Sequence, residues 1–237
     1  MTTEEAPVEE TFISHLVELR DRLVKAIIGV ALVCIALMIW PGPKEVYDFL
    51  AEPMLQSLPP GAKMIATGVV SPFLVPMKVT LMVALIIALP WVFYQIWAFV
   101  APGLYAHEKR LVLPLVISSS LLFIGGVAFC YFLVFGRVFH FIAEFAPSTI
   151  AVMPDIENYL DFVMSMCLAF GATFEVPVVV VILVRMGLVS IAKLKEIRPY
   201  IIVGAFVIAA IVTPPDVVSQ FSLAIPMCLL FELGLLV

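Results

Sequence analysis

Charged side chains are scarce in this sequence. They make up 13% of its 237 residues, and hydrophobic residues make up 63%. An ordinary soluble domain has roughly 25% charged and roughly 45–50% apolar residues. Because a soluble fold must carry polar groups over its outside, this composition excludes a soluble enzyme and predicts an integral membrane protein. The apolar excess excludes intrinsic disorder, and a net charge of −5 without a basic stripe disfavours a nucleic-acid partner.

Motifs for catalysis, metal binding and cofactor binding are also missing. The three histidines lie in three separate segments, and His107-Glu108 is not followed by a second histidine at the zinc spacing. No Walker A loop and no G-x-G-x-x-G occurs. The four cysteines show no C-x-x-C spacing and lie in apolar runs, which is typical of small buried hydrophobic residues. We therefore expect no enzyme activity, no metal and no cofactor.

Long hydrophobic runs dominate what is present. A bilayer core is roughly 30 Å thick, which a helix of about 20 apolar residues crosses. The runs are continuously apolar rather than alternating, so they predict helices and not the strands of a barrel. The expected fold class is an all-α integral membrane protein with one transmembrane domain, 1–237, and six spans: 24–40, 73–99, 111–135, 162–184, 199–213 and 217–237.

The segments that connect the spans differ in length. An amphipathic helix is expected within 1–23, ahead of the first span, and a second amphipathic stretch, 46–58, predicts a short helix on the membrane interface. The remaining connections are 41–72, 100–110, 136–161, 185–198 and the Pro-Pro turn 214–216.

The fifth span is short. Fifteen residues reach only about 22 Å, less than the thickness of a bilayer core. Either this span and the sixth form a hairpin that thins the membrane or sits shallowly in it, or the fifth helix extends beyond 199–213 in both directions. The sequence supports the two alternatives equally.

The distribution of basic residues predicts the orientation. With the N-terminus inside, nine Lys and Arg lie in inside segments and four in outside segments, so the positive-inside rule places both termini in the cytoplasm. Segments 41–72, 136–161 and 214–216 are then periplasmic. The inside set is Arg20, Arg22, Lys25, Lys109, Arg110, Arg185, Lys193, Lys195 and Arg198, and the outside set is Lys44, Lys63, Lys78 and Arg137.

Glu175 is the most informative single residue, because it lies near the middle of the fourth span. A carboxylate there costs at least about 2.5–3.5 kcal/mol on insertion scales, so a wet cavity, a partner or protonation must offset it. A protonated acid bonded to a neighbouring helix is the structural interpretation. We favour a functional one, because intramembrane carboxylates usually line a pathway or a site. The run Ser118-Ser119-Ser120 in the third span is typical of close helix packing.

Two acidic groups on the cytoplasmic side have ordinary interpretations. Apolar residues recur at helical spacing in 12–23, so Glu18 and Arg22 share a polar face as an i,i+4 pair. Glu108 lies in a charged stretch, 105–110, typical of a loop. Such exposed pairs are worth about 0.3–0.5 kcal/mol. Spacing alone favours these interpretations for both groups.

Two other classes of function stay open on these residues. Glu175 would suit a proton-coupled secondary transporter of a small solute, although the sequence shows no internal repeat and few polar residues on the other spans. An intramembrane enzyme would need a nucleophile and a base at membrane depth, which 118–120 without a nearby histidine does not supply.

Motifs along nearly the whole chain resemble those of the TatC family, the polytopic subunit of the twin-arginine protein translocase, and proteobacterial members above all. The motifs are His15-Leu16-Val17-Glu18-Leu19-Arg20, Ser71-Pro72-Phe73, Tyr94-Gln95-Ile96-Trp97-Ala98-Phe99, His107-Glu108-Lys109-Arg110, Phe174-Glu175-Val176-Pro177, Arg198-Pro199-Tyr200, Thr213-Pro214-Pro215-Asp216 and Ala224-Ile225-Pro226.

The resemblance implies a concave, glove-like bundle in the bacterial inner membrane, with both termini cytoplasmic and helices five and six short. It implies single-span partners, TatA and TatB, in complexes with several copies of this chain, and export driven by the proton gradient. Among the residues, it implies a patch of Glu18 and Glu108 that receives the two arginines of a signal peptide, which reverses the interpretation from spacing. The other implied positions are Leu19, Arg20 and Phe99 for the signal peptide, Glu175 as a buried carboxylate, Thr213 and Gln220 for partner docking, and Pro53 and Asp216 as further functional positions.

Overall fold

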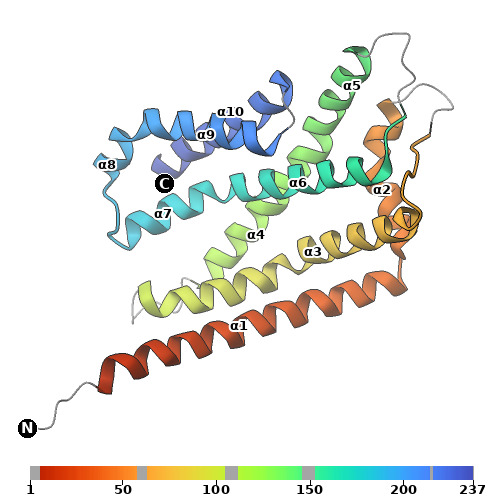
Figure 1. Cartoon of the computed structure of the whole chain (residues 1–237). Helices are drawn as coiled ribbons and strands as arrows, with labels where there is room; N and C mark the ends of the chain where they lie inside the picture. The colour runs from red at the N-terminus through yellow and green to blue at the C-terminus, as the bar shows by residue number, and fades with distance from the viewer. Residues whose placement is uncertain (1–5, 58–62, 105–111, 146–152, 214–215, 237) are drawn as a thin grey trace, which may run out of the picture.

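The computed structural model describes residues 6–57, 63–104, 112–145, 153–213 and 216–236 (Figure 1). Within these ranges the regular structure is helical, apart from one isolated bridge between Ile65 and Asp155. Five helical segments are long and apolar enough to cross a membrane, and a sixth, Arg198–Val212, is shorter. The six helical spans expected from the sequence are therefore present.

The helices follow one another along the chain with few long connections. They are α1 (Ala6–Ile39), α2 (Pro43–Ser57), α3 (Ser71–Leu104), α4 (Val112–Phe129), α5 (Phe135–Phe145), α6 (Ile156–Phe174), α7 (Val176–Arg185), α8 (Ile191–Glu196), α9 (Arg198–Val212) and α10 (Val217–Leu236). A π-helical segment, η2 (Cys130–Val134), joins α4 to α5, so the third span continues past its expected end.

Two spans differ from the simplest expectation in length. The amphipathic stretch before the first span is not a separate helix, because α1 runs unbroken for 34 residues, about 51 Å. That is longer than a bilayer core, so one end of α1 must project from it. At the other extreme, α9 has 15 residues and begins directly after Ile197, which separates it from α8. The short alternative for the fifth span is correct.

The spans form an open, curved row rather than a closed ring. Contacts run from α1 to α3, from α3 to α4, from α4 to α6, and from α7 to α10 and on to α9. Both termini lie on one side of this row, together with the end of α3 and with α8 (Figure 1). We call this the terminal side. The opposite side carries α2, the end of α5 and the start of α6, and we call it the cap side.

Helix α6 lies at the centre of the row and supplies the largest part of the core. Leu160, Val163, Met166 and Phe170 on α6 are almost completely buried. Rings from neighbouring helices complete this core, since Phe129 packs at 5.8 Å from Phe170 between ring centroids. Apolar side chains on the outer faces of the spans are exposed in the protein alone, as expected for surfaces that face lipid.

The cap helix α2 packs on the bundle instead of lying only on the interface. Its apolar residues Val46, Leu50 and Met54 recur every four positions, which places them on one helical face, and all three are buried in the main core. Phe49, another apolar residue of the stretch 46–58, is 55% exposed and stacks on Tyr131 instead. The amphipathic pattern therefore marks a protein contact on one face.

A polar clasp joins the segment before α3 to the start of α6 on the cap side. Asp155 caps α6 by accepting from the backbone N–H groups of Glu157 and Asn158, and it also accepts from the N–H and hydroxyl of Thr67. The Thr67 hydroxyl, with backbone N–H donors, holds the pKa of the Asp155 carboxyl below its usual value. Glu157 then accepts from Ser71 at 2.8 Å and pairs with Lys78 at 3.3 Å.

Helices α4 and α6 come into close contact at Gly126, and this contact predicts the effect of adding a single methyl group. A Cβ at Gly126 would lie 2.5 Å from the carbonyl oxygen of Phe170, whereas a Cβ at Gly125 would meet nothing within 4 Å. We expect Gly126→Ala to destabilise the protein by about 1–3 kcal/mol, because α6 backbone must move. Thermal unfolding in detergent measures this.

The neighbouring glycine is the control for that experiment. Alanine is favoured over glycine in a helix by about 1 kcal/mol, so Gly125→Ala should leave stability unchanged or raise it. Equal unfolding temperatures for the two variants would contradict the close contact.

Candidate functional site

The first candidate site lies on the terminal side, where α1 meets α3. Glu18 on α1 accepts from Arg22, one turn further on, at 3.3 Å between Oε1 and Nη2. The same guanidinium donates through Nη1 to Oε1 of Gln95 on α3 at 3.5 Å. Gln95 is only 2% exposed. The i,i+4 pair expected from spacing is therefore real, and a buried amide of the second helix anchors it.

Aromatic stacking brings a second predicted residue to the same place. The ring of His15 on α1 stacks on Phe99 of α3, with 4.3 Å between centroids and 22° between planes. His15 lies about one turn before Glu18 on α1, and Phe99 lies one turn after Gln95 on α3. The His15–Phe99 stack and the hydrogen bond to Gln95 therefore join the same two helices at neighbouring turns. Glu18 and Phe99 thus share one site.

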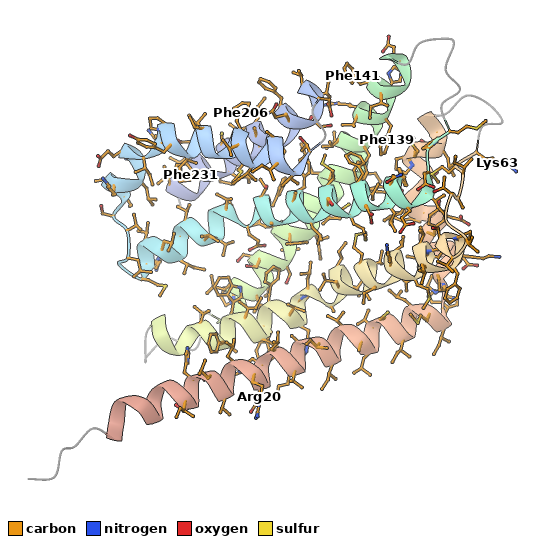
Figure 2. The ribbon with its side chains drawn as sticks, viewed as in Figure 1. Arg20, Lys63, Phe139, Phe141, Phe206 and Phe231 are labelled. Carbon is orange, nitrogen blue, oxygen red and sulfur yellow. The ribbon has the colours of Figure 1, made fainter. Side chains whose placement is uncertain are left out.

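Of the other residues predicted for this site, two are exposed on α1 and one lies outside the described residues. Leu19 is 44% exposed. Arg20 is exposed, pairs with its neighbour Asp21 at 2.8 Å, and extends away from α3 (Figure 2). Glu108 lies outside the described residues. Sequence reasoning missed Gln95, although a polar amide inside the long apolar run 73–99 was a signal that could have found it.

The second candidate site is the intramembrane carboxyl group. Glu175 does not lie within a continuous helix: it is the junction residue between α6 and α7. Pro177 follows two residues later and has no N–H for the carbonyl of Thr173, so the regular hydrogen bonding stops here. The carboxyl bonds the side chain of Ser119 on α4. Its Oε1 atom is buried and has no partner among the described residues.

The third candidate site is the short hairpin of α9 and α10. Thr213 ends α9 and its hydroxyl donates to the carbonyl of Ala209 at 2.8 Å. Asp216 caps α10 by accepting from the N–H of Ser219 at 2.7 Å. Gln220 reaches across the hairpin and donates to the carbonyl of Phe206 at 3.3 Å. The turn residues 214 and 215 lie outside the described residues.

An ion pair closes the other end of this hairpin. Arg198 at the start of α9 donates to Glu232 near the end of α10, with 2.6 Å between Nη2 and Oε2. Between the two ends, Phe206 packs edge-on against Phe221 at 5.2 Å. The two helices of the hairpin therefore contact each other near the turn, in the middle and at the open end. These contacts hold α9 and α10 together as one stiff surface.

Pro53 matters for the structure because it leaves a backbone carbonyl of α2 without its helical hydrogen bond. It lies inside α2, where its missing N–H leaves the carbonyl of Phe49 without the usual helical partner. The hydroxyl of Tyr131, on η2, donates to that carbonyl. One residue on, the hydroxyl of Tyr159 on α6 donates to the carbonyl of Leu50 at 2.8 Å. Pro53 thus opens an acceptor through which the third span holds the cap helix.

These sites are suited to bind cations and hydrogen-bond donors. No cluster of three or more His, Cys, Asp or Glu side chains that could hold a metal ion occurs in the described part of the chain. The acidic groups Glu18 and Glu175 suit guanidinium, hydroxyl or amide donors. The arrangement therefore points to recognition.

Comparison with known proteins gives one consistent result. A family model described as Sec-independent protein translocase protein (TatC) matches residues 14–226. The chain is 51% identical over 228 residues to the protein of that name from Haemophilus influenzae, covering 96% of this chain and 88% of the relative. It is equally identical over 229 residues to that of Escherichia coli strain K12, with the same coverage of both chains.

Solved structures agree with this sequence similarity. The crystal structure of the Twin Arginine Translocase Receptor TatC matches with a TM-score of 0.79 at 37% identity, over 94% of this chain and 96% of that one. A second crystal structure of the same receptor, in DDM, matches with a TM-score of 0.82 over 94% and 98% of the two chains. The open, glove-like arrangement of six spans is confirmed.

The proline-opened carbonyl in α2 predicts a specific non-additivity. Tyr131→Phe leaves the Phe49 carbonyl without its donor, so we expect a loss of about 1–3 kcal/mol of stability. In a Pro53→Ala background, the new N–H of residue 53 can bond that carbonyl, and Tyr131→Phe should then cost much less. Thermal unfolding of the four proteins measures the difference.

Tyr159→Phe is the matched control, because its acceptor, the carbonyl of Leu50, is four residues before Met54 rather than a proline. Its cost should be the same with Pro53 and with Ala at position 53. Strict additivity of Tyr131→Phe and Pro53→Ala would refute the explanation.

Proposed function

Because the chain belongs to the TatC family of Sec-independent protein translocase proteins, we propose that Glu18 and Glu108 receive the two arginines of a twin-arginine signal peptide. Membership makes the protein a translocase component and a receptor subunit rather than an enzyme. The proton-coupled solute transporter and the intramembrane enzyme considered from the sequence are thereby set aside.

The observation that carries the proposal is the state of Glu18. Its side chain is 38% exposed, although the amide of Gln95 beside it is buried. Only Oε1 takes part in the contact with Arg22, at a rather long 3.3 Å. The carboxylate is therefore accessible, held in place from one side, and already in contact with one guanidinium. A second guanidinium can approach from the open side.

The chemistry of guanidinium explains why arginine would be preferred. Arginine is always charged and presents a planar fork that matches a carboxylate with two bonds, whereas lysine offers a point charge. Two carboxylates at a fixed spacing would then select a pair of arginines over a pair of lysines. The half-buried ring of Phe99 and the exposed side chain of Leu19 would contact the apolar part of the signal beside them. Arg20 would act at the rim of this site.

Chain connectivity supports the contribution of Glu108. It follows Leu104, the last residue of α3, by four positions, and four residues span at most about 14 Å. Phe99, on the last turns of the same helix, is already in contact with α1 through His15. The end of α3, after which Glu108 follows in the sequence, therefore lies next to the part of α1 that carries Glu18, and this supports the proposal.

We propose the α9–α10 hairpin as the docking surface for the single-span subunits TatA and TatB. A 15-residue helix leaves polar groups of the turn, including Thr213 and Gln220, deeper in the membrane than a full span would. Asp216 supports that turn as the cap of α10. Pro53 supports the opposite side of the row through the cap helix. Glu175 would serve as the intramembrane polar site.

The protein is a multi-pass membrane protein, and we propose the orientation and assembly that follow from the charges. The terminal side carries most of the basic residues, so both termini would face the cytoplasm of a bacterium across its inner membrane. Signal peptides would then arrive on the terminal side. Passage of folded cargo would need complexes with TatA, TatB and further copies of this chain, driven by the proton gradient, because the described helices pack in an open row rather than a ring.

Charge removal tests the recognition site. A hydrogen bond to a charged group is worth about 1.5–3 kcal/mol, so we expect Glu18→Gln and Glu108→Gln each to weaken binding of a twin-arginine peptide roughly 10- to 100-fold. The double variant should lose the preference for Arg-Arg over Lys-Lys, and added salt should barely affect it. Titration of labelled peptides against detergent-solubilised protein measures both.

Asp21→Asn is the matched control for this titration, since Asp21 is an exposed carboxylate on the same helix that pairs with Arg20. It should leave peptide binding unchanged. If the double variant still preferred Arg-Arg by the wild-type margin, Glu18 and Glu108 would not be the residues that recognise the two arginines.

Site-specific crosslinking tests the docking surface. A photo-crosslinker at position 220 should capture a single-span subunit, because the hairpin is stiff and Gln220 is half-buried at its turn. Position 121 on α4 is the comparison, since Leu121 is 67% exposed on another helix. Crosslinks from position 220 to lipid alone, in membranes that contain both subunits, would contradict the proposal.

A further inference from the structure

The three consecutive serines of α4 do not share one role. Ser118 donates to the carbonyl of Leu115 at 3.1 Å, and Ser120 donates to that of Val116 at 2.7 Å, so each satisfies itself within its own helix. Ser119 is different. Its side chain is completely buried and makes contacts with two other helices.

The first of these contacts comes from α3. The indole Nε1–H of Trp97 donates to Oγ of Ser119 at 3.2 Å. An indole nitrogen is only a donor, so Ser119 must be the acceptor in this bond. The proton of the serine hydroxyl is therefore available for another group.

The second contact identifies that group. Ser119 hydrogen-bonds the carboxyl of Glu175 at the junction of α6 and α7. A carboxyl oxygen is a good acceptor for the hydroxyl proton. The three residues thus form a directed chain, from the indole through the hydroxyl to the carboxyl, and each comes from a different part of the row: α3, α4 and the α6–α7 junction.

The chain leaves the carboxyl half satisfied. Oε1 of Glu175 is buried without a partner among the described residues. In an apolar surrounding an unmade hydrogen bond is unfavourable, and one donor on the carboxyl restricts the rotation of the group. A carboxyl held on one side by Ser119 keeps its other oxygen in a defined place.

We propose that Trp97 and Ser119 are positioning residues for Glu175: they fix the carboxyl against α4 and leave its Oε1 atom open for one further donor. This inference rests on the proposed role of Glu175 as the intramembrane polar site. Trp97 lies between Gln95 and Phe99 on α3, so the helix that contributes to the signal-peptide site also holds the support of Glu175.

Infrared spectroscopy of the purified full chain tests the positioning directly. The carboxyl band of Glu175 is identified as the band lost in Glu175→Gln. We expect Ser119→Ala to shift this band, because the carboxyl loses its donor, and Trp97→Phe to shift it in the same sense by less. Ser118→Ala is the matched control and should leave the band in place. Ser119→Thr, which keeps a hydroxyl, should return it close to the wild-type position.

Transport provides the second measurement and separates this inference from the proposed role of Glu175. In membranes with the partner subunits, Ser119→Ala should reduce export of a twin-arginine precursor several-fold, and Ser118→Ala should not. Normal export by Glu175→Gln would overturn the role of Glu175 while the band shift still supported the positioning. An unshifted carboxyl band in both Ser119→Ala and Trp97→Phe would overturn the positioning itself.

Discussion

Inside a bilayer there is no water to complete an unpaired hydrogen bond, and this constraint organises the whole molecule. Most polar groups of the spans satisfy it locally. Ser118 and Ser120 fold back onto their own helix, Thr213 does the same at the end of α9, and Gln220 bonds a carbonyl across the hairpin. These bonds stabilise the helices and their pairing without requiring any other molecule.

Two exceptions to local satisfaction lie at the proposed functional sites. Gln95 is buried in an apolar helix and has a charged partner on α1, and Glu175 lies where the helical hydrogen bonds stop. Both are supported by residues from other helices, and Glu175 keeps one oxygen without a partner in the described chain. A membrane protein can keep such groups only where the surrounding helices hold them, which is why an open row of helices has its polar sites at helix contacts.

More of the fold than of the candidate sites could be predicted from the sequence. The number of spans and the all-α class follow from the length of the apolar runs, and the short α9 was one of two stated alternatives. The unbroken α1 and the π-helical link were not expected, because tertiary packing decides such junctions. Glu18 and Glu175 are acidic residues that stand out in the sequence. Their supports, Gln95, Ser119 and Trp97, are neutral residues far along the chain, and nothing in their spacing reveals which helices will meet.

The hydrogen bonds that hold the cap helix α2 determine when it can dock during synthesis of the protein. The hydroxyl that completes the open carbonyl of Phe49 belongs to a residue 82 positions later in the chain, and the one that bonds Leu50 is 109 positions later. At roughly 5–20 residues per second, the ribosome supplies these two tyrosines about 4–22 s after α2. During that interval the carbonyl of Phe49, which lacks its helical N–H partner because of Pro53, can be hydrogen-bonded only by water. The cap helix must therefore wait in an aqueous layer until the third span has been inserted, and its docking on the bundle is a late step of biogenesis.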